Sequence, residues 1–66
     1  MSEMICWVVM EEGGIEPVTG VVFMIEDMAR VKLADGRTRT TRRSNLRDPD
    51  YPDQQWNYGK WLLEMP

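Results

Sequence analysis

The fold is decided by one stretch of this 66-residue chain, Val31-Lys32-Leu33-Ala34-Asp35-Gly36-Arg37-Thr38-Arg39-Thr40. Its first part alternates apolar and polar residues with the period of two that is typical of a half-buried β-strand. Asp35-Gly36 is a strong hairpin signal, because a type I′ turn requires positive φ at both central residues. We therefore predict two antiparallel strands, at 30–33 and 37–43, joined by a two-residue turn.

A two-residue turn determines which side chains share a face of the hairpin. Leu33 would lie opposite Thr38, and Val31 opposite Thr40, so that these four side chains face the core. The solvent-facing side would then carry Arg30, Lys32, Arg37 and Arg39. The predicted basic face depends on this register.

The segments before the hairpin also favour strands. Residues 5–9 and 21–25 are short runs rich in β-branched and aromatic residues. Glycines at 13 and 14, together with Pro17 and Gly20, predict a loop between them. We expect Trp7 in the core, since a domain this small needs large side chains to fill its interior.

The segments after the hairpin are more varied. Ser44-Asn45-Leu46 is typical of a single helical turn with Leu46 reaching the core. Pro49 and Pro52 make 48–53 an ordered or extended loop, because proline lacks the N–H that a helix or sheet interior requires. For the aromatic segment 54–66 we predict a last strand at 61–65, with a short helix from Asp53 as the alternative.

This order of elements resembles an SH3-like barrel, and the stretch 18–46 is similar to Tudor-like and KOW-like small barrels. The similar residues are Gly20-Val21-Val22-Phe23-Met24-Ile25, Val31-Lys32-Leu33-Ala34-Asp35-Gly36 and Ser44-Asn45-Leu46. The resemblance implies an all-β, five-stranded SH3-like barrel with one short helical turn before the last strand. It also implies that the chain binds proteins or nucleic acids and does not catalyse a reaction.

Composition bounds the remaining possibilities. Hydrophobic residues make up 42% and charged residues 29% of the chain, a globular balance that we interpret as one domain over 1–66. Cys6 is the only cysteine and histidine is absent, so an internal disulfide and a four-ligand zinc site are both excluded within one chain. A core this small favours self-association as a supplement. We expect a cytoplasmic protein, with no membrane partner, in which Cys6 is buried.

Signals for chemistry are weak. Without histidine the usual proton carrier near neutral pH is missing. Glu11 and Glu12 are adjacent and would point to opposite sides of an extended chain. We predict no enzymatic activity, no catalytic residue and no cofactor. Three aspartates at 48, 50 and 53 suggest calcium, but the prolines between them and the lack of a distal bidentate Glu argue against a metal site.

The charge pattern is the most informative feature. Residues 30–47 hold seven of the eight basic residues and one acidic residue, a net charge of +6, whereas the rest of the chain sums to −9. Such segregation attracts a partner of opposite sign, although it is also compatible with a merely solvated face. Our candidate partner-binding residues are cations of this segment and aromatics of the tail: Arg30, Lys32, Arg37, Arg39, Arg42, Arg43, Trp56, Tyr58 and Trp61.

Three kinds of partner remain open. A protein partner suits a basic patch on an acidic domain, with Arg and Trp as interface anchors. Nucleic acid would require exposed aromatic rings for base stacking, and the net charge of −3 counts against it. A small anionic ligand bound at an oligomer interface is the third alternative. We favour the protein partner.

Overall fold

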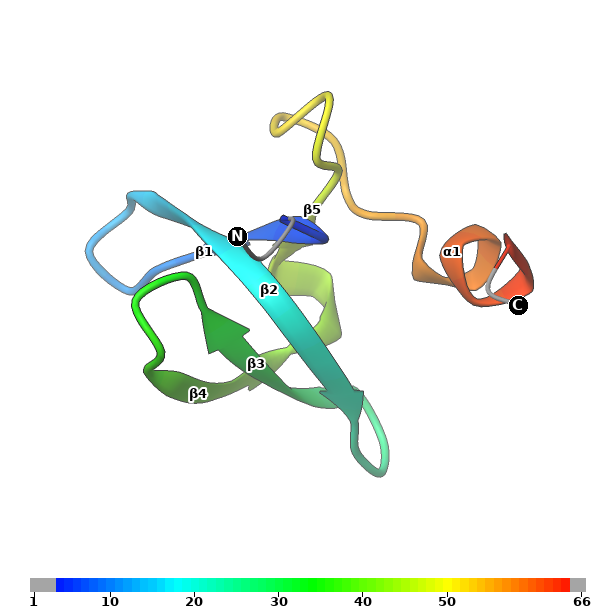
Figure 1. Cartoon of the computed structure of the whole chain (residues 1–66), viewed down its shortest axis with the longest axis horizontal. Helices are drawn as coiled ribbons and strands as arrows, with labels where there is room; N and C mark the ends of the chain where they lie inside the picture. Colours follow the sequence, from blue (N-terminus) through cyan, green and yellow to red (C-terminus); the bar gives the residue numbers. More distant parts are fainter. Residues whose placement is uncertain (1–3, 65–66) are drawn as a thin grey trace.

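A computed structural model describes residues 4–64, apart from the side chains of Trp61 and Glu64. Within these residues one antiparallel sheet has the strand order β4-β3-β2-β1-β5 (Figure 1). The strands are β1 Cys6–Val9, β2 Ile15–Phe23, β3 Met28–Leu33, β4 Thr38–Arg42 and β5 Leu46–Arg47. A 3₁₀ turn, η1 Arg43–Asn45, precedes β5, and a helix, α1 Tyr58–Glu64, follows it. The expected all-β class, with five strands and a helical turn before the last one, is confirmed.

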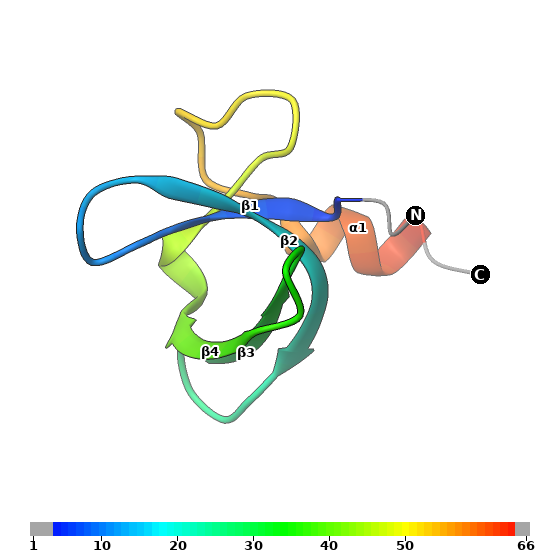
Figure 2. The ribbon, with the colours of Figure 1, turned by 60° about the vertical axis from the view of Figure 1, so that its left-hand side comes forward.

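The long strand β2 links the two halves of the sheet. It pairs with β1 along Ile15–Val18 and with β3 from Val18 to Phe23, and a bulge interrupts the second pairing between Val18 and Gly20. The bulge adds twist, and in Figure 2 β2 bends from the layer of β1 toward the layer of β3 and β4. The predicted loop over Pro17 and Gly20 is therefore wrong, because both residues lie within β2.

Pro17 is tolerated in β2 because of its position. It lies opposite Trp7 at a site whose N–H would point away from β1, and pairing with β3 begins only at Val18. The Pro17 carbonyl accepts from the Ala34 N–H at 3.2 Å, and an N–H at position 17 would point to the same side, so proline leaves the pairing with β1 intact and limits the β2–β3 ladder at this end.

The β3–β4 hairpin forms as predicted, but its register differs by one residue. The Leu33 N–H donates to the Arg37 carbonyl at 2.8 Å, and the Gly36 N–H donates to the Leu33 carbonyl at 3.0 Å. The loop thus has three residues, Ala34 to Gly36, and Gly36 has a φ of 94°. A type I turn followed by a glycine in the left-handed region gives this geometry, in place of the expected two-residue turn.

This shift changes the faces of β4. Val31 lies opposite Arg39 and Ala29 opposite Thr41, whereas Lys32 pairs with Thr38 and Arg30 with Thr40. The prediction that Thr38 and Thr40 face the core is wrong, since both are exposed. Arg39 and Thr41 instead lie half-buried on the inner side. The predicted grouping of Arg30, Lys32, Arg37 and Arg39 on one face is wrong for the same reason.

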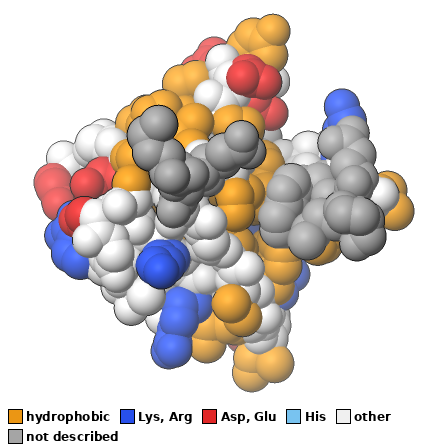
Figure 3. Space-filling model, in the orientation of Figure 1, with side chains coloured by type: hydrophobic (Ala, Val, Ile, Leu, Met, Phe, Trp, Pro, Cys, Tyr) orange, Lys and Arg blue, Asp and Glu red, His pale blue; other side chains and the backbone are white. Residues whose placement is uncertain are grey.

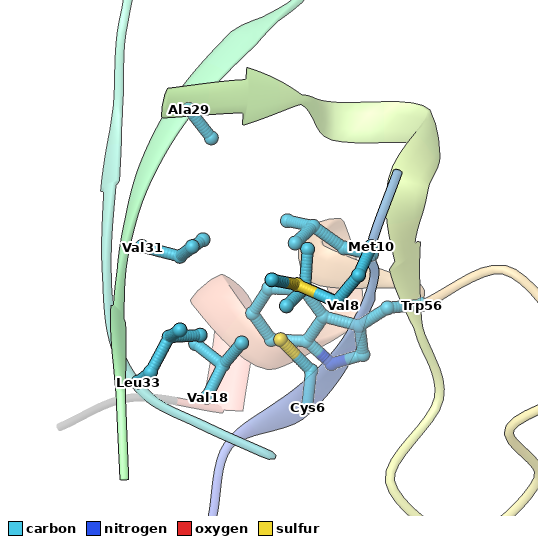
Figure 4. Packing of buried hydrophobic residues seen from close by; sticks show 9 residues of the cluster. Cys6, Val8, Met10, Val18, Ala29, Val31, Leu33 and Trp56 are labelled. Atoms are coloured by element: carbon cyan, nitrogen blue, oxygen red, sulfur yellow. The ribbon is translucent and has the colours of Figure 1, made fainter. Parts of the chain in front are cut away.

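The core lies inside the curled sheet. In Figure 4, Ala29, Val31 and Leu33 point from β3 toward the side chains of β1. The buried cluster consists of Cys6, Val8, Met10, Val18, Ala29, Val31, Leu33, Leu46 and Trp56. The alternation of β1 and β3 explains most of this set, because every second residue faces inward. The predicted burial of Cys6 and Leu46 is confirmed.

Trp7 is not part of this core. It alternates with the inward-facing Cys6 and Val8, so its half-buried ring lies on the outer side of β1. There its indole Nε1–H donates to the Pro49 carbonyl at 3.2 Å. The ring therefore holds the 48–53 loop against the sheet, which replaces its predicted role in the interior.

The loop at 48–53 is ordered, in agreement with the sequence. The Asp48 side chain accepts from the N–H groups of Asp50 and Tyr51, at 2.8 and 3.1 Å. Its backbone N–H also donates to the Gln54 carbonyl at 2.9 Å. These bonds close a compact turn and return the chain to β5.

The predicted last strand at 61–65 is wrong over its described part, because Tyr58–Glu64 is helical, and Met65 lies outside the described residues. The place beside β1 is taken by β5, where Leu46 pairs with Val8. The strands β4 and β5 form the two edges of the sheet and share no ladder. Among the described residues, no helix is long and apolar enough to cross a membrane.

Candidate partner-binding surfaces

The outer side of β3 and β4 carries three exposed cations, Arg30, Lys32 and Arg42, which we call the outer cationic face. Arg30 and Lys32 alternate with the buried residues of β3, and Arg42 lies opposite Met28 on β4. Thr38 and Thr40 are the other residues of this face on β4, so neither strand contributes a carboxylate to it. Val22 of β2 lies opposite Arg30 and is 65% exposed. In the described part of the chain, no ion pair engages these three cations.

The charge distribution over the surface follows this arrangement. In Figure 3, Lys and Arg side chains lie mainly over the left and lower left of the view, with another at the upper right, and Asp and Glu side chains lie at its left and upper edges. A surface patch of one sign attracts partners of the opposite sign. The outer cationic face is thus a patch of one sign on an acidic domain.

Arg37 is separated from this face by its own carboxylate partners. Its guanidinium lies 2.5 Å from Asp35 and 3.2 Å from Glu16. The Arg37 backbone N–H, followed by its guanidinium, holds the pKa of Asp35 below the usual range. Asp35, and then Glu16, raise the pKa of Arg37. The charge of Arg37, one of the predicted site residues, is therefore compensated by two carboxylates of the same chain.

Arg43 faces an aromatic cluster. Its guanidinium carbon lies 5.1 Å from the ring centre of Phe23 and 5.9 Å from that of Tyr58. Its Nε donates to the Met28 carbonyl at 3.2 Å, and its Nη2 donates to the Met24 carbonyl. These bonds fix the end of the β2–β3 hairpin to η1, so the guanidinium of Arg43 has a structural role within the chain.

The described tail aromatics pack against the sheet. Trp56 is only 5% exposed, and its ring stacks on Phe23 with centres 6.5 Å apart. Tyr58 is half-buried, 5.1 Å from the ring centre of Phe23. Trp56, a candidate partner-binding residue, is therefore part of the core. The side chain of Trp61, the third aromatic of the predicted site, lies outside the described part.

A cleft of about 420 Å³ opens between β4 and the end of β1. Two of the predicted site residues, Arg39 and Arg42, line it. The lining combines the end of β1 with β4 and nearby residues: Val8, Val9, Met10, Glu11, Met28, Arg39, Thr40, Thr41, Arg42 and Asn45. Asn45 is held there by donating its Nδ2–H to the Thr41 hydroxyl at 2.9 Å.

Sequence reasoning missed this cleft because it depends on the register of the hairpin. With a two-residue turn, Arg39 would have faced outward and Thr40 inward. The signal that could have revealed the cleft is Ala34-Asp35-Gly36 itself, since a glycine at the third loop position also suits a three-residue connection.

The described residues provide little for metal or nucleophilic chemistry. No group of three or more Cys, Asp or Glu side chains among them could hold a metal ion. Burial raises the pKa of the Cys6 thiol to about 12. A protonated thiol is a poor nucleophile, because the thiolate is the reactive form.

Comparison with protein-family models, curated proteins and solved structures finds no match for this chain.

Proposed function

We propose that this chain is a small, non-enzymatic binding protein that docks on an acidic surface of a larger protein through Arg30, Lys32 and Arg42. The observation that supports this proposal is the presence of three exposed cations on one side of β3 and β4, without a carboxylate from either strand. Arginine is favoured at protein interfaces, and its planar guanidinium pairs with carboxylates through two parallel hydrogen bonds. Val22 adds apolar area beside these charges.

Nucleic acid is the weaker alternative. A single-strand binder stacks bases on exposed aromatic rings, and Trp56 is buried while Tyr58 packs on Phe23. The net charge of −3 also opposes approach to a phosphate backbone.

The test is capture of partners from native lysate by the tagged full chain, before and after nuclease treatment. The double variant Arg30→Glu/Lys32→Glu should reduce the captured protein at least tenfold, because it replaces attraction with repulsion at the centre of the face. Arg47→Glu/Lys60→Glu is the control, with the same change in net charge at sites outside the face. Equal capture by both double variants would reject this face, and loss of capture after nuclease would indicate nucleic acid.

A further inference from the structure

The free edge of β4 leaves backbone hydrogen-bonding groups available. β4 pairs with β3 alone, so within the described residues its other side has no strand partner. The Arg37 carbonyl bonds to Leu33 and the Arg43 N–H bonds to Asp27, which shows that the odd-numbered residues point their backbone groups toward β3. By the alternation of an antiparallel ladder, the N–H and C=O groups of Thr38, Thr40 and Arg42 point away from β3.

This edge borders the cleft described above. Thr40 and Arg42 line the cleft, and the end of β1 with Val8 and Met10 forms its opposite wall. The outward-pointing backbone groups of Thr38, Thr40 and Arg42 span about 13 Å, which is four steps of about 3.3 Å in an extended chain. An extended segment of another protein could therefore hydrogen-bond to β4 while alternate side chains enter the cleft.

We propose that the β4 edge binds an extended, acidic segment of the partner protein by strand addition. This inference rests on the proposed function and specifies how the partner is held. Side chains of the added strand on the inner side would enter the cleft beside Val9 and the edge of Met10, which favours apolar residues there. Side chains on the outer side would lie beside Thr40 and Arg42, which favours Asp or Glu.

A second copy of this chain fits the edge less well. Antiparallel pairing of two β4 strands would place Arg39 of both copies on the inner side and Arg42 of both copies on the outer side, adding four positive charges along one ladder. Like charges on facing strands are destabilising, and cations on an edge strand are a common device against self-pairing. The same arginines are complementary to carboxylates, so the charge favours an acidic segment over self-association.

The probes for this proposal are two synthetic heptapeptides of alternating residues, Glu-Val-Glu-Val-Glu-Val-Glu and its lysine counterpart, both capped at their ends. The acidic peptide should shift the backbone amide resonances of Thr38, Thr40 and Arg42 in a ¹⁵N NMR titration of the full chain, and the lysine peptide should not. Shifts confined to Arg30 and Lys32 would overturn strand addition and leave the proposed function standing. Absence of binding by the acidic peptide would also overturn it, while lysate capture reports separately on the proposed function.

Backbone pairing is tested by N-methylation of the acidic peptide. In an antiparallel addition the glutamates lie opposite Thr38, Thr40 and Arg42 and direct their N–H groups toward β4. N-methylation of the glutamates at peptide positions 3, 5 and 7 should weaken binding at least tenfold. N-methylation of the three valines should weaken binding much less. The reverse order would indicate a parallel addition. Equal binding by these two isomers would overturn the proposal.

A variant of the protein gives an independent check. Thr40→Pro removes one free N–H without removing a bond to β3, because proline is tolerated at edge positions whose N–H faces outward. It should weaken binding of the acidic peptide at least tenfold, whereas Thr40→Val, which keeps the N–H, should retain it. Unchanged binding by a folded Thr40→Pro variant would contradict strand addition, and the N-methylated peptides decide the question if that variant does not fold.

Discussion

Cys6 illustrates how position controls the chemistry of one side chain. It is the only cysteine of the chain, and the structure places it among the aliphatic side chains of the core with no exposed surface. Burial disfavours the charged thiolate, and it raises the pKa of this thiol from 9.0 to about 12. The sequence predicted burial from the apolar run around Cys6, and the structure confirms it.

This shift makes stability depend on pH in a defined direction. Between pH 9.0 and about 12 the folded chain keeps the thiol proton while the unfolded chain releases it. The Cys6 contribution is therefore complete below pH 9 and declines by about 1.4 kcal/mol per pH unit above it. We expect the free energy of unfolding of wild type to fall more steeply above pH 9 than that of Cys6→Ala, measured by urea titration. Parallel pH profiles would contradict the shift.

Leu46 is the residue that joins the helical turn to the core. It is fully buried and pairs with Val8, and its carbonyl accepts from the Trp56 N–H at 2.9 Å. Leu46→Ala should reduce the free energy of unfolding by about 2–5 kcal/mol, since it leaves a cavity between β1 and β5. Leu63→Ala, at a residue 88% exposed, is the control and should change it by less than about 0.5 kcal/mol. Similar losses in the two variants would reject this account of the core.

At the scale of elements, the hairpin shows what local sequence could and could not predict. Alternation placed β3, and Asp35-Gly36 placed the turn, because both signals are carried by neighbouring residues. The register was not determined by those signals, since Asp-Gly is compatible with a two-residue and a three-residue loop. In the folded chain the Asp35 carboxylate accepts from the Arg37 N–H at 3.0 Å, and Leu33 is held opposite Val18 of β2. The second of these contacts is distant in sequence.

The C-terminal segment shows the same limitation. Its short apolar run is compatible with a strand or a helix, because periodicity does not separate the two at this length. A local signal was nevertheless present, since Asn57 accepts from the Lys60 N–H at 3.1 Å, and Asn is a favoured residue at the start of a helix. The burial of Trp56, by contrast, depends on Phe23, which is far away in the sequence.

The three-residue loop can be tested through its glycine. Gly36 has a φ of 94°, where a residue with a Cβ is strained. Gly36→Ala should lower the free energy of unfolding by about 1–2 kcal/mol, judged from the cost of left-handed backbone in other residues. Gly14→Ala is the matched control, because this position lacks a positive φ and has open space around the added methyl group. Equal effects on the melting temperature would argue against the loop geometry.

At the scale of the whole molecule, the folded unit is the sheet together with Trp56. The resemblance to SH3-like barrels correctly predicted the number of strands and the helical turn. It did not predict that the two edge strands, β4 and β5, would share no ladder. Pairing between β4 and β5 is absent from the ladder of the described residues, and β4 is left with an unoccupied edge. Whether a strand edge is left unpaired depends on where all the strands begin and end. The sequence of one segment does not determine this.

Truncation tests where this unit ends. A chain ending at Tyr58 should retain a melting temperature close to that of the full chain, because Leu62 and Leu63 of α1 are exposed. A chain ending at Gln55 lacks the buried Trp56 ring and should lose about 3–5 kcal/mol, the range for removing a large core aromatic. Thermal unfolding by circular dichroism measures both. Unfolding of the longer truncated chain would show that α1 belongs to the stable unit.

The position of Arg43 also has a consequence for selectivity. Rings such as Phe23 and Tyr58 can form the kind of π-rich niche in which choline or a methylated lysine is recognised. Here the chain's own guanidinium lies over both rings, 5.1 Å from the centre of Phe23. An incoming alkylammonium group would have to displace it and deprive the Met24 carbonyl of the Arg43 donor. The Arg43 guanidinium therefore competes with any quaternary amine for these two rings, and it disfavours such ligands without a side chain that blocks them sterically.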